Sequence, residues 1–242
     1  MNANDVMNAN DEIADELRRQ YPGLFHEPTP EEEARMLAER ERQARVRATE
    51  EARQRRQTHA SWGIPLKDIE AIGTGHLRET AATRILAAFA EDRTTELLVL
   101  SGPVGCGKTT AAAQWLCRAR EAPSWLETQP PLFLPVAQFE RTSRYSAQAM
   151  SRMERARALV LDDLGAEYLD DKGAFVALLD SLIDARYRDL RPTVITTNLH
   201  ASQFAARYGE RTVDRIRERG RFVELAGESQ RRKGGSSHGL AS

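Results

Sequence analysis

Short apolar runs recur along the chain from about Trp62 onward, each flanked by polar residues. They lie at 97–100, 132–136, 159–161, 193–196 and 222–225. Runs of this length, bounded by turn-forming residues, are typical of buried β-strands. The pattern therefore predicts five strands.

Helical periodicity fills the intervals between these runs. Residues 77–90 and 111–116 are predicted helices, and 172–189 has the clearest amphipathic pattern. In that last segment the apolar residues recur at three- and four-residue spacing: Phe175, Leu178, Leu179, Leu182 and Ile183. Strands that alternate with helices form a parallel sheet with helices on both faces, so the predicted fold class is α/β.

The region before Trp62 has a different pattern. A short helix is expected at 12–20, and Thr29-Pro30 followed by three glutamates forms a strong start for a second helix, which should run to about Arg56. Its apolar residues, mostly alanine, make a stripe too thin to anchor a core. The segment is either a solvated helical arm or a docking arm for a partner protein.

These patterns divide the chain into three expected parts. Residues 1–58 form the charged helical arm, 59–233 the α/β domain, and the Gly/Ser-rich residues 234–242 a disordered tail. The apolar fraction of 40%, somewhat low for a wholly globular chain, agrees with such a division.

Charge and cysteine content restrict the classes of function. The net charge is −1, so no global field favours nucleic acid, and the longest apolar runs are too short to cross a membrane. The N-terminus is polar and does not look like a signal peptide. Cys106 and Cys117 lie about 16 Å apart on the predicted loop and helix, too far for a disulfide. Two free thiols indicate a reducing compartment, hence the cytoplasm.

The residues after the 97–100 strand fit the phosphate-loop pattern G-x-x-x-x-G-K-[ST]. Glycines let such a loop wrap around phosphate oxygens, and the helix that follows adds its positive N-terminal end. Lys108 would reach the β- and γ-phosphates of ATP, and the Thr109 hydroxyl would bind Mg²⁺. The predicted nucleotide-binding residues of this segment are Gly102, Pro103, Val104, Gly105, Cys106, Gly107, Lys108, Thr109 and Thr110.

Two further strands end in polar residues suited to the same chemistry. Asp162 and Asp163 follow 159–161, where the first would hold Mg²⁺ and the second would polarise the attacking water. Taken alone, these acids could equally form a turn. Asn198 follows 193–196 and would aim its amide at the γ-phosphate, although an asparagine after a strand commonly caps a turn.

Arginines supply two more candidate functions. Arg211 and Arg215 could stabilise transition-state charge on a neighbouring subunit's γ-phosphate, or could lie on a solvated helix face. The segment 139–157 mixes arginines with aromatic residues and suits single-stranded DNA, with Phe139, Arg141, Arg144 and Tyr145 as the predicted contacts. A charged, solvated helix surface is the alternative there.

Taken together, the ordered motifs from Trp62 to about Lys233 resemble the AAA+ ATPases of the DnaC/IstB type, which are bacterial helicase loaders and transposition helpers. The matching segments are Gly63-Ile64-Pro65, 102–109, Leu161 to Glu167, Ala185-Arg186-Tyr187, Arg191 to Leu199, Tyr208 to Arg215, and Gly227 to Arg231. The resemblance implies a P-loop NTPase (AAA+) fold, a three-layer sandwich with a five-stranded parallel sheet. It also implies homo-oligomers that bind ATP and Mg²⁺ between subunits.

The resemblance also implies roles for individual residues. Asn198 would be sensor 1, Arg215 an arginine finger acting in trans, and Arg231 a sensor-2-like residue. Many AAA+ enzymes carry glutamate where this chain has Asp163, and the shorter carboxylate is consistent with a slow switch rather than a motor.

Three functional hypotheses follow. The leading one is an ATP-dependent loader that binds a replicative hexameric DNA helicase through 1–58 and single-stranded DNA through 139–157. The second is an IstB-type transposition helper ATPase that binds DNA and recruits a transposase. The third is a regulatory module that binds nucleotide without turnover, against which the intact Lys108, Asp162, Asp163 and Arg215 argue.

Overall fold

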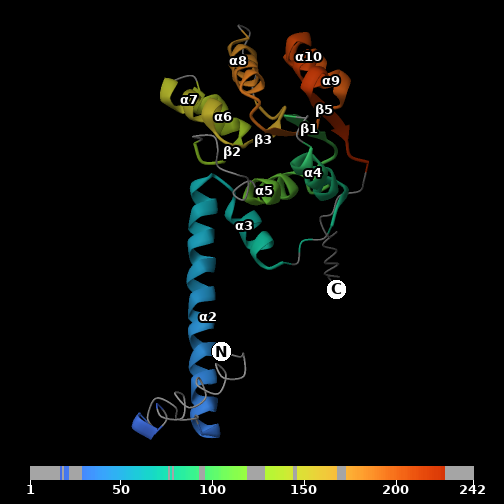
Figure 1. The fold of residues 1–242 in the computed structure, drawn as a ribbon. Helices are drawn as coiled ribbons and strands as arrows, with labels where there is room; N and C mark the ends of the chain where they lie inside the picture. The colour runs from blue at the N-terminus through green and yellow to red at the C-terminus, as the bar shows by residue number, and fades with distance from the viewer. Residues whose placement is uncertain are drawn as a thin grey trace, which may run out of the picture. The chain divides into compact units, whose positions relative to one another are not determined.

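A computed structural model gives the fold of the chain (Figure 1). It describes residues 17, 19–21, 29–75, 77, 79–92, 96–118, 129–143, 146–167 and 173–226. The described helices are α2 (Pro30–Ser61), α3 (Leu66–Gly73), α4 (Ala81–Glu91), α5 (Lys108–Arg118), α6 (Val136–Ser143), α7 (Ala147–Arg155), α8 (Ala174–Arg188), α9 (Ala201–Tyr208) and α10 (Glu210–Arg219). The described strands are β1 (Leu97–Ser101), β2 (Leu132–Pro135), β3 (Leu159–Leu164), β4 (Thr193–Thr197) and β5 (Gly220–Glu224).

The five strands form one parallel sheet in the order β2-β3-β4-β1-β5. β1, which leads into the phosphate-loop segment, pairs with β4 on one side and β5 on the other. β3 pairs with β4 in a register that shifts between Leu161 and Leu164. This arrangement places the carboxyl ends of β1, β4 and β3 side by side, because neighbouring parallel strands end at the same edge of a sheet.

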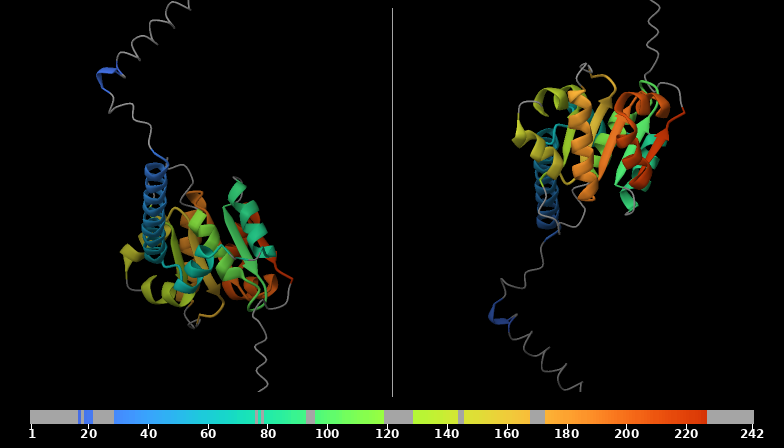
Figure 2. Two further views of the ribbon diagram at one scale, coloured as in Figure 1. Left: turned by 90° about the horizontal axis from the view of Figure 1, so that it is seen from below. Right: turned by 90° about the horizontal axis from the view of Figure 1, so that it is seen from above.

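Helices cover both faces of the sheet and create two apolar cores (Figure 2). Side chains alternate along a strand, so Leu98 and Leu100 of β1 enter the core under α3, α4 and α5. Leu97 and Val99 enter the second core, which α6 to α10 cover. The predicted α/β fold class is confirmed, and the unit from Gln54 on has the three-layer form of a P-loop NTPase.

The segment before α3 is joined to the sheet by a close backbone contact. The Phe133 N–H donates to the Trp62 carbonyl oxygen across 2.7 Å. A Cβ at Gly63 would lie 2.4 Å from the Phe133 carbonyl oxygen, and the φ of Gly63 is +88°. Only glycine fits there, since both the space and the backbone conformation exclude a side chain.

Helix α2 is described by itself, because the chain divides into one unit up to Arg53 and a second from Gln54 on. It runs for 32 residues and buries none of them. Its first turn carries Glu31, Glu32 and Glu33, which complement the positive helix end as the sequence predicted. Within the described parts of the chain, no helix is long and apolar enough to cross a membrane.

Most sequence-predicted elements have the right type, but several bounds differ. α2 continues to Ser61 rather than ending near Arg56, and β3 extends to Leu164. α4 begins at Ala81 rather than near 77, because Thr80 caps its first turn. The sequence did not predict α3, whose short amphipathic pattern lies in a segment assigned no element. The 12–20 helix and the 234–242 tail lie largely or wholly outside the described residues.

Candidate nucleotide-binding site

The phosphate loop connects β1 to α5 and has the backbone that its glycines predict. Gly102, Gly105 and Gly107 all have positive φ, at +154°, +87° and +93°. These conformations turn the loop back over the first turn of α5, and L-residues rarely adopt them. The Gly102 N–H donates to the Thr197 carbonyl oxygen across 3.2 Å, which fixes the start of the loop to β4.

Lys108 is buried at the centre of this loop, with 7% of the residue exposed. Its Nζ donates to the carbonyl oxygens of Gly102 at 2.6 Å and Pro103 at 3.0 Å. It also donates to Asn198 Oδ1 at 3.0 Å. The ammonium group therefore already lies where the loop carbonyls and the end of β4 converge.

Asp162 lies at the end of β3 and faces the first turn of α5. Its Oδ1 accepts a hydrogen bond of 2.7 Å from the Thr196 hydroxyl, and Thr109 also hydrogen-bonds to its side chain. Burial raises the pKa of Asp162 above its ordinary value, while these two hydrogen bonds act in the opposite direction. The hydroxyls of Thr196 and Thr109 thus both contact the Asp162 carboxylate.

Asp163 differs from Asp162 in exposure and in backbone conformation. Its φ is +64°, an uncommon value for a residue other than glycine, and its N–H donates to Thr196 Oγ1 at 2.9 Å. Asn198 Nδ2 donates to Asp163 Oδ1 at 3.0 Å. Asp163 is exposed. Its side chain is hydrogen-bonded to the same asparagine that contacts Lys108.

These contacts form one connected group at the carboxyl edge of the sheet. The hydrogen bonds run from Lys108 to Asn198 and from Asn198 to Asp163. They join residues that follow β1 and β4 to a residue near the carboxyl end of β3. Sequence reasoning predicted all three residues separately. The strand order explains why they meet, since β4 lies between β1 and β3.

The residues present fit a Mg²⁺–nucleotide complex. The loop offers a backbone cradle with a lysine, and Thr109 and Asp162 offer two oxygen ligands of the type that Mg²⁺ prefers. Lys108 and the N-terminal end of α5 provide positive charge for phosphate.

Comparison with protein families decides the assignment. A family model described as "IstB-like ATP binding protein" matches residues 30–238. The chain belongs to the IstB-like ATP-binding protein family. A comparison with curated proteins gave no significant match.

Three solved structures are similar to this IstB-like protein, of which the first has the highest TM-score of the three. The crystal structure of the DnaC helicase loader is 21% identical, with a TM-score of 0.50, and the match covers 63% of this chain and 94% of that one. DnaI is 23% identical over 62% of this chain and 82% of its own, with a TM-score of 0.49. A putative primosome component from Streptococcus pyogenes serotype M3 is 22% identical over 62% and 80%, also at 0.49. At these identities the likeness concerns the fold alone.

Arg215 of this IstB-like chain lies away from the phosphate loop, on α10. Its Nη2 and Nε contact Asp184 Oδ1 at 3.0 and 3.2 Å. Its guanidinium carbon lies 4.9 Å from the centroid of the Tyr187 ring. Arg211, one turn earlier, pairs with Asp180 at 3.1 Å. Both predicted arginines thus pair with carboxylates of α8 within the described chain.

The predicted DNA contacts meet one correction. Phe139 of α6 has no exposed surface and packs edge-on against Phe175, with the ring centroids 5.5 Å apart. The prediction that Phe139 stacks on a base is wrong, because its ring belongs to the apolar core. The sequence misled because phenylalanine serves both as a stacking platform and as a core residue. Arg141, two positions on, is exposed.

Three other predicted site residues lie outside the described residues: Arg144, Tyr145 and Arg231. Their predicted roles in DNA and nucleotide binding stay predictions.

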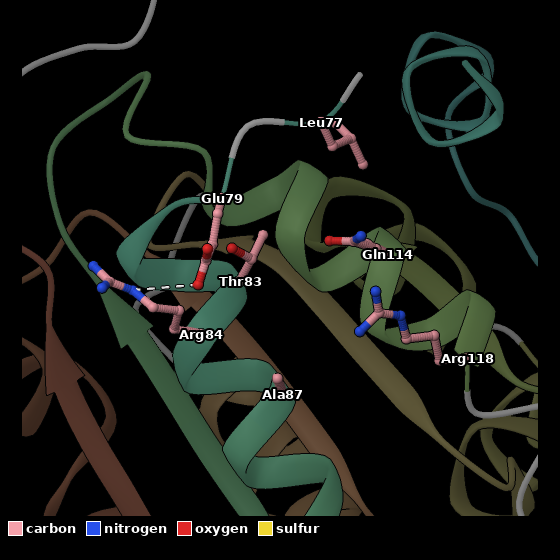
Figure 3. Close-up of a pocket in the computed structure, with 7 residues that line it drawn as sticks. All are labelled: Leu77, Glu79, Thr83, Arg84, Ala87, Gln114 and Arg118. Atoms are coloured by element: carbon pink, nitrogen blue, oxygen red, sulfur yellow. Dashed lines mark ion pairs between the residues drawn. The ribbon is translucent and has the colours of Figure 1, made fainter. Parts of the chain in front are cut away.

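A hollow of about 300 Å³ lies between α4 and α5, separate from the loop residues (Figure 3). Figure 3 shows Arg84 directed toward Glu79 at one side and Arg118 at the other. The residues that line the hollow are Leu77, Glu79, Thr83, Arg84, Ala87, Gln114 and Arg118. No residue predicted from the sequence to bind nucleotide belongs to this set.

Sequence reasoning missed two supporting residues. Thr196 bonds both acids of β3, and the polar run that ends β4 was a signal for it. Glu167 is fully buried as a side chain, where its Oε1 accepts from Arg207 Nε at 2.9 Å and the Tyr208 hydroxyl at 2.6 Å. Its Oε2 accepts from the Gly165 N–H at 2.7 Å. These bonds connect the chain after β3 to α9.

Proposed function

We propose that this chain is an AAA+ switch that hydrolyses ATP. The observation that carries the proposal is the hydrogen-bonded group formed by Lys108, Asn198 and Asp163 at the carboxyl edge of the sheet. It joins a phosphate-binding cation to a carboxylate that can polarise water. Few structural demands other than phosphate chemistry require these groups at three adjacent strand ends.

Each residue has a distinct task in this proposal. Lys108 leaves the loop carbonyls and binds the β- and γ-phosphates, while Thr109 and Asp162 hold Mg²⁺. When bound, Mg²⁺ neutralises charge on the phosphate oxygens. Asp163 orients the attacking water and accepts its proton, and Asn198 holds the Asp163 carboxylate in place.

The proposal includes homo-oligomers with ATP between subunits, in which Arg215 serves the neighbouring site. In the single chain the guanidinium contacts Asp184 and the Tyr187 ring of α8. An arginine that is ordered before assembly loses less side-chain entropy when it meets a phosphate.

We further propose that the switch loads a replicative hexameric helicase onto single-stranded DNA. The supporting observation is α2, a long helix that buries none of its residues and exposes Leu37 and Val46 by 60% and 62%. Such a helix contributes no core and offers apolar anchors to a partner. Arg141, Arg152 and Arg155 on α6 and α7 are exposed and suit DNA phosphates.

The second candidate is an IstB-type transposition helper, which the family match over 30–238 favours. It shares the nucleotide chemistry but differs in partner, because it recruits a transposase. Preference for duplex over single-stranded DNA would also favour it.

Capture of partners from host extract separates the two candidates. The full chain with ATP and Mg²⁺ is compared with a Leu37→Glu/Val46→Glu variant and with a Gln43→Glu/Thr49→Glu control, which adds the same charge to the same helix. Capture of a hexameric helicase by wild type and control, but not by the first variant, supports the loader. A captured transposase contradicts the loader, and a helicase captured equally by all three proteins contradicts docking through Leu37 and Val46 of α2.

A further inference from the structure

Asp68 of α3 is a buried carboxylate that the proposed chemistry does not use. The residue is only 3% exposed. Its Oδ1 accepts a hydrogen bond of 2.6 Å from the Thr110 hydroxyl. Its Oδ2 is buried and has no hydrogen-bond partner among the described residues. Leaving one oxygen of a buried carboxylate unpaired is unfavourable, so this arrangement requires a reason.

The position of Asp68 suggests that reason. Thr110 lies in the first turn of α5, directly after Thr109, and the charge of Asp68 acts on Asp162. Asp68 therefore adds, after Asp163, a second negative charge to those that act on Asp162. Like charges disfavour one another until a cation arrives.

Glu167 provides an internal comparison. It is also buried, with 5% of the residue exposed against 3% for Asp68, yet both of its oxygens accept hydrogen bonds, from Arg207, Tyr208 and Gly165. Both oxygens of this carboxylate are therefore satisfied. Glu96 also leaves one buried oxygen without a hydrogen-bond partner, but an arginine, Arg219, lies 3.6 Å from its other oxygen. Asp68 differs because its second oxygen has no described partner.

We propose that Asp68 is a positioning residue of the nucleotide site, which orients the Thr110 hydroxyl and whose charge the bound Mg²⁺–nucleotide complex compensates. This inference rests on the proposed nucleotide binding. Asp68 acts through Thr110 and through its field rather than as a metal ligand, since no cluster of three or more candidate metal-binding side chains occurs in the described chain.

The test is Asp68→Asn in the full chain, with the non-hydrolysable analogue AMPPNP as the probe. The amide keeps the shape of the side chain and removes its charge. We expect about a tenfold weaker affinity for AMPPNP with Mg²⁺ by calorimetry, the effect typical of losing an outer-shell partner. In EDTA we expect tighter binding of AMPPNP, because a negative charge near the phosphates is gone. The melting temperature without nucleotide should rise, since a buried unpaired charge is removed.

Glu70→Gln is the matched control. Glu70 lies two positions away on α3 but is exposed and pairs with Arg56. The Glu70→Gln substitution should change neither the affinity for AMPPNP nor the nucleotide-induced rise in melting temperature. Thr110→Val should lower the melting temperature without nucleotide, because Asp68 then loses its described hydrogen bond.

The outcomes distinguish this inference from the proposed function. Asp68→Asn with unchanged affinity in both Mg²⁺ and EDTA overturns the inference, as does a lower melting temperature with unchanged affinity, which would indicate a purely structural residue. If Asp68→Asn does not fold, Asp68→Ser is measured against the same expectations. Failure of the wild-type chain to bind AMPPNP at all would instead contradict the proposed function.

Discussion

Helix α2 and the unit from Gln54 on use the same charged residue types in opposite ways. In α2 the arginines are exposed, and the described ion pair of Arg53 is with Glu50, one turn away. In the α/β unit Arg186 is completely buried and donates to five oxygens, those of Met153, Glu154, Ala156, Pro192 and the Thr193 side chain. The first kind of contact is local along one helix. The second joins α7, α8 and β4 across long stretches of sequence.

This contrast separates two tasks. Up to Arg53, the described side-chain contacts of α2 are local, so its surface there tolerates substitution and is free to be shaped by a partner. A site assembled from three strand ends depends on packing between segments far apart in the chain. Substitutions in α2 should therefore change the binding of partners. Substitutions in the unit that follows it should change chemistry or stability.

The largest expected effect comes from Lys108→Ala. Removing the ammonium group deletes the cation at the centre of the loop, so binding of Mg²⁺–ATP should fall below detection in a calorimetric titration. Arg42→Ala in α2 is the control and should bind like wild type. Retained affinity in Lys108→Ala would contradict the assignment of the loop.

Arg215→Ala should spare nucleotide binding but reduce hydrolysis. Arginine fingers contribute about 10³–10⁵ in rate in well-studied cases. Mixing this variant with Lys108→Ala should restore part of the activity, because one mixed interface then contains both an intact loop and an intact finger. Steady-state phosphate release measures both effects, and full activity of Arg215→Ala would remove the residue from the site.

Arg186→Met should lower the free energy of unfolding by about 3–5 kcal/mol, because buried oxygens lose their donor. Burial lowers the pKa of Arg186 to about 9, so the guanidinium is still charged at neutral pH. Arg42→Met in α2 should change the same quantity by no more than about 0.5 kcal/mol. Urea unfolding measures the free energy of unfolding of both variants. Equal losses of stability would contradict the contrast between α2 and the unit that follows it.

The smallest expected effect concerns thiol reactivity. Burial raises the pKa of Cys117 in α5 to about 11, so only about one thiol in a thousand is ionised at pH 8. Alkylation of Cys117 should be slow and should accelerate with pH up to about 11. A cysteine placed on the exposed arm by Ala44→Cys should react at the rate of a model peptide. Mass spectrometry over time measures both rates, and equal rates would show that α5 is not packed as described.

Much of the α/β unit was predictable because its signals are local. The phosphate loop follows a fixed spacing, and the apolar runs of β1 and β3 are continuous, so residues such as Lys108 and Asp162 could be named from the sequence. Their meeting point required the strand order, which no local pattern contains.

The residues that sequence reasoning misjudged depend on tertiary contacts. Phe139 has the composition of a stacking site but packs on Phe175. Asp68 lies on a helix too short to predict, and its significance arises only from Thr110, 42 positions away. Arg186 was recognised as part of a motif, but its burial was not predicted. The backbone oxygens that its guanidinium contacts belong to other segments, and no periodic sequence pattern indicates such contacts.

Phosphate release from ATP by the full chain tests the central claim most directly. It is measured with Mg²⁺ and single-stranded DNA over increasing protein concentration, for wild type and Asp163→Asn. The account predicts slow hydrolysis by wild type that rises with concentration, and an Asp163→Asn protein that binds ATP without releasing phosphate. Tight ATP binding by wild type with no phosphate release at any concentration would contradict it, and would make the chain a nucleotide-binding regulatory module instead.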